Sequence, residues 1–169
     1  MLGSEQSTPA GFKIRFAQES DVKVILQFII ALGAYEKLSN EVVATEEKLL
    51  ESLFHRHMAE VIIGEFEGNA VGFALFFHNY STFLGQAGIY LEDLFVKPEM
   101  RGKGFGKSML RYLAKIAVDR GCGRLEWACL DWNEPAIRFY RNLGATAMED
   151  WTVYRLSGDT LQKLSQENG

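Results

Sequence analysis

A glycine-rich segment in the second half of the chain has the composition of an anion-binding turn. Residues 101–106 read RGKGFG and directly precede a predicted helix. Glycine permits positive φ angles and lets a ligand approach the backbone closely. Successive amide N–H groups, the positive end of the helix dipole and the charges of Arg101 and Lys103 can then converge on one anion. The segment therefore predicts a pyrophosphate-binding turn, with a plain tight turn as the structural alternative.

Two familiar nucleotide-binding motifs come close to this segment and do not match it. The dinucleotide fingerprint needs G-x-G-x-x-G, whereas the spacing here is G-x-G-x-G. A P-loop would need glycine at position 101, before Gly106-Lys107-Ser108, and that position is Arg101. A shift of one residue changes which amide groups converge. A P-loop nucleotide hydrolase therefore stays an alternative.

Two adjacent acids, Glu92 and Asp93, interrupt an otherwise apolar strand predicted over residues 89–96. Neighbouring strand positions face opposite sides of a sheet, so one acid points to each face unless the strand bulges. A buried carboxylate needs a partner or a function. An alkyl amine has a pKa of about 10.4, so about one molecule in 10³ is neutral at pH 7. A carboxylate that holds the ammonium and accepts its proton would help such an amine to react, and an ion pair is the alternative interpretation.

A phenol near the end of the chain is a candidate proton donor. Tyr140 lies in a predicted helix that begins near Pro135 and is capped by Asn133. A phenol with a pKa of about 10 stays protonated at neutral pH and can donate its proton. Tyr140 also stands at helical spacing from Ile137, so a core aromatic is the alternative.

These segments resemble the GNAT superfamily of N-acetyltransferases. Arg101-x-x-Gly104-x-Gly106 matches the acyl-CoA-binding pattern of that family, and N-x-x-A-x-x-F-Y-x-x-x-G at residues 133–144 matches its second signature. Tyr35-Glu36, the YLED string at 90–93 and the WNEP string at 132–135 are similar to the diamine (spermidine/spermine) acetyltransferase group, which includes thialysine N-ε-acetyltransferases. The similarity extends from Phe12 to about Lys163.

The resemblance implies acetyl-CoA as cosubstrate, a small-molecule amine as acceptor, no metal, and a homodimer. It implies Glu92 and Tyr140 as catalytic base and acid, and a substrate site that contains Tyr35, Glu36, Phe83, Glu92 and Asp93. Phe83 stands near the position where the polyamine enzymes have a tryptophan. The residues implied to bind the cosubstrate are Leu94, Phe95 and Val96 through their backbone, together with Arg101, Gly102, Lys103, Gly104, Phe105, Gly106, Lys107, Asn133, Ala136 and Tyr140.

The elements that must position these residues alternate between strand and helix. The hydrophobic pattern predicts the order β-α-α-β-β-β-α-β-α-β, an α/β fold of the GNAT type with a mixed sheet of about six or seven strands and about four flanking helices. Residues 1–11 are expected to be a flexible tail and 12–169 a single domain. The predicted strands cover residues 12–16, 61–66, 70–77, 89–96, 124–130 and 152–156. The predicted helices cover residues 21–35, a segment after Thr45, residues 107–120 and a segment from Pro135, and Ser20 is expected to cap the first of them.

Composition narrows the function classes further. The chain has 169 residues, 18 basic and 22 acidic, for a net charge of −4, so it lacks the basic footprint of a nucleic-acid-binding protein. Its two cysteines, Cys122 and Cys129, form neither a zinc motif nor a disulfide framework. Without a membrane-length apolar run or a secretory signal, the expected location is cytoplasmic. A catalytically silent acyl-CoA-binding module and an acetyltransferase for another small amine or a protein stay open as alternatives.

Overall fold

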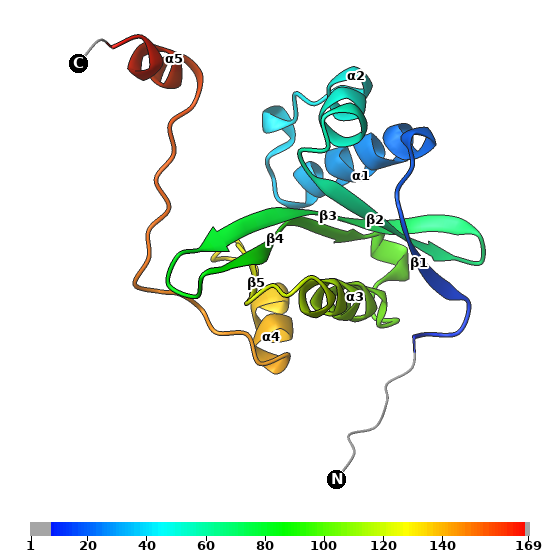
Figure 1. Ribbon diagram of the computed structural model, residues 1–169. Coiled ribbons are helices and arrows are strands. Elements are labelled where there is room, and N and C mark those ends of the chain that lie inside the picture. The colour runs from blue at the N-terminus through cyan, green and yellow to red at the C-terminus, as the bar shows by residue number, and fades with distance from the viewer. Residues whose placement is uncertain (1–7, 168–169) are drawn as a thin grey trace. The chain divides into compact units, whose positions relative to one another are not determined.

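The computed structural model describes residues 8–167, and Figure 1 shows the course of the chain. The chain divides between Ala128 and Cys129 into two compact units, and each is described by itself. The single domain expected over residues 12–169 therefore stays a prediction. Within the expected tail, the carbonyl groups of Pro9 and Gly11 accept hydrogen bonds from the amides of Phe12 and Glu67, while residues 1–7 lie outside the described part.

The first unit is built on a mixed sheet with the strand order β1-β2-β3-β4-β5. Neighbouring strands from β1 to β4 are antiparallel, and β5 is parallel to β4, as the order of predicted strands and helices had indicated. The predicted hairpin over residues 61–77 is present as β2 and β3. The strands are β1 (Phe12–Phe16), β2 (Glu60–Phe66), β3 (Asn69–Ser81), β4 (Gln86–Val96) and β5 (Leu125–Trp127).

One face of the sheet is covered by α1 (Val22–Tyr35), α2 (Glu46–Leu49) and the π-helical segment η3 (Leu50–His55), as Figure 1 shows. Apolar residues recur every three or four positions along α1 and so form one buried stripe. Phe28 of this stripe stacks on Phe73 of β3 at 5.6 Å and lies 5.9 Å from the ring of Phe95 of β4. This core fixes α1 against the two central strands.

The opposite face is covered by α3 (Phe105–Asp119). Its first residue, Phe105, is buried and stacks face to face on Phe12 of β1, with ring centroids 4.2 Å apart. Met109 and Leu113 follow at helical spacing and are fully buried. The start of α3, and with it the glycine turn that precedes it, is therefore anchored by the core.

The second unit contains α4 (Glu134–Asn142) and α5 (Gly158–Gln166). Asn133 caps α4 as predicted, because its side-chain oxygen accepts a hydrogen bond from the amide of Ala136 at 3.4 Å. Between the two helices, the described residues 151–157 form neither helix nor strand.

The structure corrects several details of the predicted fold. The described part of the chain has five strands rather than six or seven, and five α-helices rather than about four. The alternating segment 152–156 is not a strand, because no strand in the described residues pairs with it, and α5 follows where only a polar tail had been expected. The strand expected over 124–130 is shortened to Leu125–Trp127. Ser20 does not cap α1, since a 3-10 turn at Glu19–Asp21 leads directly into that helix.

Candidate active site

A cavity of about 510 Å³ lies between the C-terminal half of α1, the loop that follows it, α2, η3 and the middle of β4. Gly33 of α1 lets the loop approach, because a Cβ at this position would lie 2.6 Å from Cγ2 of Val42. The amide of Leu38 also bonds to the carbonyl oxygen of Gly33 at 2.8 Å, which ties the loop to the helix. Every element of the cavity belongs to the first unit.

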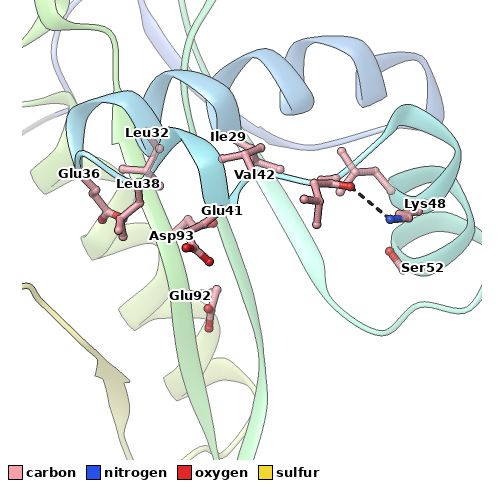
Figure 2. Close-up of a pocket in the computed structure, with 14 residues that line it drawn as sticks. Ile29, Leu32, Glu36, Leu38, Glu41, Val42, Lys48, Ser52, Glu92 and Asp93 are labelled. Carbon is pink, nitrogen blue, oxygen red and sulfur yellow. Dashed lines mark hydrogen bonds between the residues drawn. The ribbon is translucent and has the colours of Figure 1, made fainter. Parts of the chain in front are cut away.

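A β-bulge places both acids of β4 at this cavity. Leu75 of β3 pairs with Asp93 and the next residue, Phe76, pairs with Leu91, so Glu92 is the extra residue of β4. In a regular strand Leu91 and Asp93 would face the same side. Here the bulge turns the acidic segment, and both Glu92 and Asp93 line the cavity, as Figure 2 shows. The sequence had left open whether Glu92 or Asp93 faces the substrate, and in the structure both residues line this cavity.

Glu36, at the end of α1, completes an acidic cluster with Glu92 and Asp93. Burial, followed by the nearby charges of Glu92 and Glu36, raises the pKa of Asp93 to about 6. Burial and the charge of Glu92 also raise the pKa of Glu36. Carboxylates that raise one another's pKa values attract a cation, since a positive charge among them relieves the repulsion. The site is therefore suited to an ammonium group.

The rest of the cavity is apolar in its middle and basic at its far end. Ile29, Leu32 and Val42 line the middle. Lys48 and Ser52 lie together at the end away from the acidic cluster (Figure 2), and Lys48 Nζ donates a hydrogen bond to the carbonyl oxygen of Val43 at 3.2 Å.

The second half of β4 has an open edge. The pairing of β4 with β5 covers only Ile89–Leu91, so no strand among the described residues occupies that edge beyond Leu91. Successive residues of a strand direct their N–H and C=O groups to opposite edges. The amide of Lys97 bonds to Val71 of β3, so the backbone groups of Val96 and Leu94 point to the open edge. The groups of Leu94 and the amide of Val96 can bond to an extended ligand, whereas the carbonyl oxygen of Val96 already accepts a hydrogen bond from Arg101.

Arg101 connects this edge with the end of α1. Its Nε donates to the carbonyl oxygen of Val96 at 3.0 Å. Its guanidinium lies 4.6 Å from the ring centroid of Tyr35 and 5.6 Å from that of Phe95. Tyr35, expected in the substrate site, thus contacts a residue expected in the cosubstrate site and does not itself line the cavity.

The glycine turn has the backbone geometry of an anion-binding loop. Gly102 has φ +78° and Gly104, the N-cap of α3, has φ +83°, which are left-handed values that favour glycine. A Cβ at Gly102 would meet no atom within 4 Å, and one at Gly104 would meet only Cγ of Pro9, at 3.7 Å, so the space beside both glycines is largely open. No side chain caps α3, and the first amides of a helix have no acceptor within it. The side chain of Phe105 is buried, so only its backbone can serve a ligand.

The residues predicted from the second signature lie in the second unit. Asn133 is buried and its side-chain oxygen serves as the helix cap. Tyr140 is half-buried in α4, with its ring 5.4 Å from that of Phe139, and Ala136 lies one turn earlier. Their roles toward the cosubstrate stay predictions.

One predicted substrate residue lies outside the cavity. Phe83 is fully exposed in the turn between β3 and β4 and is not among the lining residues. It was predicted from its place in the sequence before the YLED strand, but β3 and β4 extend to Ser81 and Gln86 and carry it to the hairpin tip. Conversely, Lys48 and Glu41 line the cavity and were not predicted, because no local pattern marks a loop and a short helix as cavity walls.

Comparison with known proteins identifies the family of this chain. The model of the acetyltransferase (GNAT) family matches residues 30–145, which include the cavity, the glycine turn and α4. The chain belongs to the GNAT family. It is an acetyltransferase, and enzymes of this family use acetyl-CoA as cosubstrate. The resemblance found in the sequence is thereby confirmed.

Relatives of known activity cover nearly the whole chain. A thialysine N-epsilon-acetyltransferase from Sus scrofa is 40% identical over 168 residues, which span 92% of this chain and 98% of the relative. An L-ornithine N5-acetyltransferase from Arabidopsis thaliana is 32% identical over a match that spans 96% of this chain and 93% of the relative. Among solved structures, an integron cassette protein from V. cholerae is 27% identical and superimposes with a TM-score of 0.77 over 93% of this chain and 99% of its own.

The described residues fit acetyl-CoA. The open glycine turn, with Arg101, Lys103 and Lys107 around it, offers amides and charges to a pyrophosphate. The open edge at Leu94 and Val96 offers backbone groups to an extended arm. Among the residues that the structure describes, no cluster of His, Cys, Asp and Glu is arranged to hold a metal ion, and no helix is long and apolar enough to cross a membrane.

Proposed function

We propose that this acetyltransferase transfers the acetyl group of acetyl-CoA to the primary amine of a small acceptor of the diamine, polyamine or thialysine type. The observation that carries the proposal is the acidic cluster of Glu36, Glu92 and Asp93, two of whose members lie on the same strand as the open edge at Leu94–Val96. An amine held by the cluster is adjacent to the strand that would hold the cosubstrate. The relatives that act on thialysine and L-ornithine support an acceptor with a terminal amine.

The carboxylates act on the amine before transfer. Glu92, exposed on the bulge, attracts the ammonium and aids its deprotonation. Asp93, with a pKa raised to about 6, is a second proton acceptor, because a base works best when its pKa is close to the working pH. Acetyl-CoA supplies the acyl group as a thioester. The neutral amine attacks that acyl group directly, and no covalent bond to the protein is needed.

The cosubstrate is held by backbone and by charge. The amides of Gly102–Gly106 and the side chains of Arg101, Lys103 and Lys107 would bind its pyrophosphate. Leu94, Phe95 and Val96 would bind its arm, and the roles toward the cosubstrate that the resemblance implies for Asn133 and Ala136 stay predictions. Arg101 Nε now bonds to the Val96 carbonyl oxygen and would exchange that bond for one to a phosphate. The homodimer expected from the resemblance also stays a prediction, which light scattering in solution tests.

The test is release of CoA thiol from acetyl-CoA with a panel of amines: spermidine, putrescine, thialysine, lysine, ornithine and an aminoglycoside. We expect rapid turnover with one linear amine and slow turnover with the aminoglycoside, whose polar sugar rings do not suit the aliphatic side chains of Ile29, Leu32 and Val42 in the cavity. Binding of acetyl-CoA without turnover on any amine would contradict the proposal and favour a silent acyl-CoA-binding module.

Tyr140 is proposed as the acid that protonates the departing thiolate. The variant Tyr140→Phe keeps the ring and removes the hydroxyl, so we expect kcat to fall about 10²-fold while the Kd for acetyl-CoA stays unchanged. Tyr154→Phe is the matched control, because that tyrosine is almost fully exposed in the same unit. Equal kcat in wild type and Tyr140→Phe would remove Tyr140 from the mechanism.

A further inference from the structure

The acceptor cavity has opposite charges at its two ends. The acidic cluster of Glu36, Glu92 and Asp93 lies at one end, and Lys48 of α2 lies at the other (Figure 2). Among the described residues that line the cavity, Lys48 is the one cation. A cavity meant only for a polycation gains nothing from a lysine, since like charges repel.

Lys48 is held where it can face a ligand. The side chain of Thr45 caps α2 by accepting a hydrogen bond from the backbone amide of Lys48 at 3.2 Å, which fixes the position of its Cα. The carbonyl oxygen of Val43 accepts a hydrogen bond from Nζ at 3.2 Å. An ammonium has three donors, so this bond leaves capacity for an anion, and the hydroxyl of Ser52 lies on the same side of the cavity.

The surface between the two ends is apolar. Ile29 and Leu32 of α1 and Val42 of the loop line it. Glu41 of the loop also lines the cavity and adds a fourth carboxyl group to its negative charges. A ligand that extends from the acidic cluster to Lys48 therefore meets negative charge, aliphatic surface and, at the end, positive charge. A linear molecule with a terminal ammonium, an alkyl chain and a carboxylate presents the complementary sequence.

We infer that Lys48 is a specificity residue that binds the carboxylate of the acceptor, so that this enzyme selects amino acids with a terminal amine over polyamines. The inference rests on the proposed function, because it assigns the reacting amine to the acidic cluster. Glu92 and Asp93 of the cluster lie on β4, next to the edge assigned to acetyl-CoA, so the carboxylate end of the acceptor points away from the reacting centre toward α2.

Acceptor pairs that differ only in the carboxylate provide the test. L-Ornithine and putrescine form one pair, and L-lysine and cadaverine form the other. We expect wild type to have a kcat/KM at least about tenfold higher for the amino acid of each pair. In Lys48→Met this ratio should fall about tenfold, through a higher KM for the amino acid and not through kcat, while the diamine value stays within about twofold. Lys48→Glu should reverse the preference.

Controls separate this inference from the proposed function. Lys23→Met removes a lysine of the exposed face of α1, outside the cavity, and should leave both ratios unchanged. If wild type acetylates both members of a pair and Lys48→Met keeps the wild-type ratio, the assignment of Lys48 is overturned and the proposed function stands. If wild type acetylates none of the four compounds while binding acetyl-CoA, both proposals fail for these acceptors.

Discussion

The glycine turn and the acidic cluster, both in the first unit, are suited to ligands of opposite charge and are built in different ways. The glycine turn before α3 is contiguous and exposed, and it presents backbone amides and cations. The acidic cluster is assembled from α1 and β4, and burial raises the pKa of two of its three carboxyl groups. In the proposed function, one region recognises an anion through the shape of its backbone, whereas the other recognises a cation through side-chain charge. The two regions should therefore respond to different kinds of substitution.

The largest effect is expected where a side chain is added to the turn. In Gly104→Val a β-branched residue would occupy φ +83° at the N-cap of α3, so we expect acetyl-CoA affinity to fall about 10²-fold or more. Isothermal titration calorimetry measures the change. Gly68→Val is the control, since Gly68 has φ +81° in the β2–β3 turn and carries similar strain away from the site. Equal affinity loss in both variants would show that strain alone is responsible.

Asp93→Asn should act on stability. The folded-state pKa of Asp93, about 6, is above the ordinary value of 3.8 for this group, so ionisation of Asp93 opposes folding. The protonated carboxyl group of Asp93 contributes fully to the free energy of unfolding below about pH 4. That contribution, about 3 kcal/mol for a shift of this size, is lost as the pH rises through about 6. We expect Asp93→Asn to gain in free energy of unfolding relative to wild type between pH 4 and pH 8 in urea titrations. A constant difference over that range would contradict the assigned pKa.

Glu92→Gln tests whether the charge of the acidic cluster acts on the acceptor and not on acetyl-CoA. The substitution keeps the shape of the side chain and removes its charge, so we expect the acceptor KM to rise about tenfold and acetyl-CoA affinity to stay unchanged. Steady-state kinetics from pH 6 to pH 9 also compare the two proton acceptors. If the decrease of kcat at low pH disappears in Asp93→Asn and persists in Glu92→Gln, Asp93 is the general base.

Lys103→Met should give the smallest effect. Lys103 is exposed in the turn, and an exposed charge contributes little because water and salt screen it. We expect acetyl-CoA to bind about threefold more weakly at low ionic strength and almost equally at 0.5 M salt. A loss as large as that of Gly104→Val would mean that charge, and not backbone shape, dominates the turn.

This contrast also explains what could be predicted from the sequence. The glycine turn and the cap of α4 depend on residues that are neighbours in the chain, so both can be recognised from the sequence alone. Glu36, Glu92 and Asp93 were found through the family resemblance and the unusual pair of acids within an apolar strand. Lys48 was missed because it reaches the cavity through a loop closure that depends on Gly33, and no local rule describes that contact.

Errors in the predicted fold have a related cause. Alternation over residues 152–156 is a local signal for a strand, but a strand exists only where a partner completes its hydrogen bonds, and the described sheet offers this segment none. Phe83 was assigned to the substrate site by its distance from the YLED string. The length of β3 and β4 decides where that residue lies, and the sequence pattern underestimated both strands.

The bulge at Glu92 also bears on how such a site can arise. A one-residue insertion in a regular strand sends every following side chain to the opposite face of the sheet. Here Leu91 still pairs with Phe76 and Asp93 with Leu75, so the extra residue is absorbed where it stands and the faces on both sides of it are preserved. Insertion or deletion of one codon at this position would therefore add or remove a carboxylate at the cavity while the pairing of β3 and β4 on both sides keeps its register.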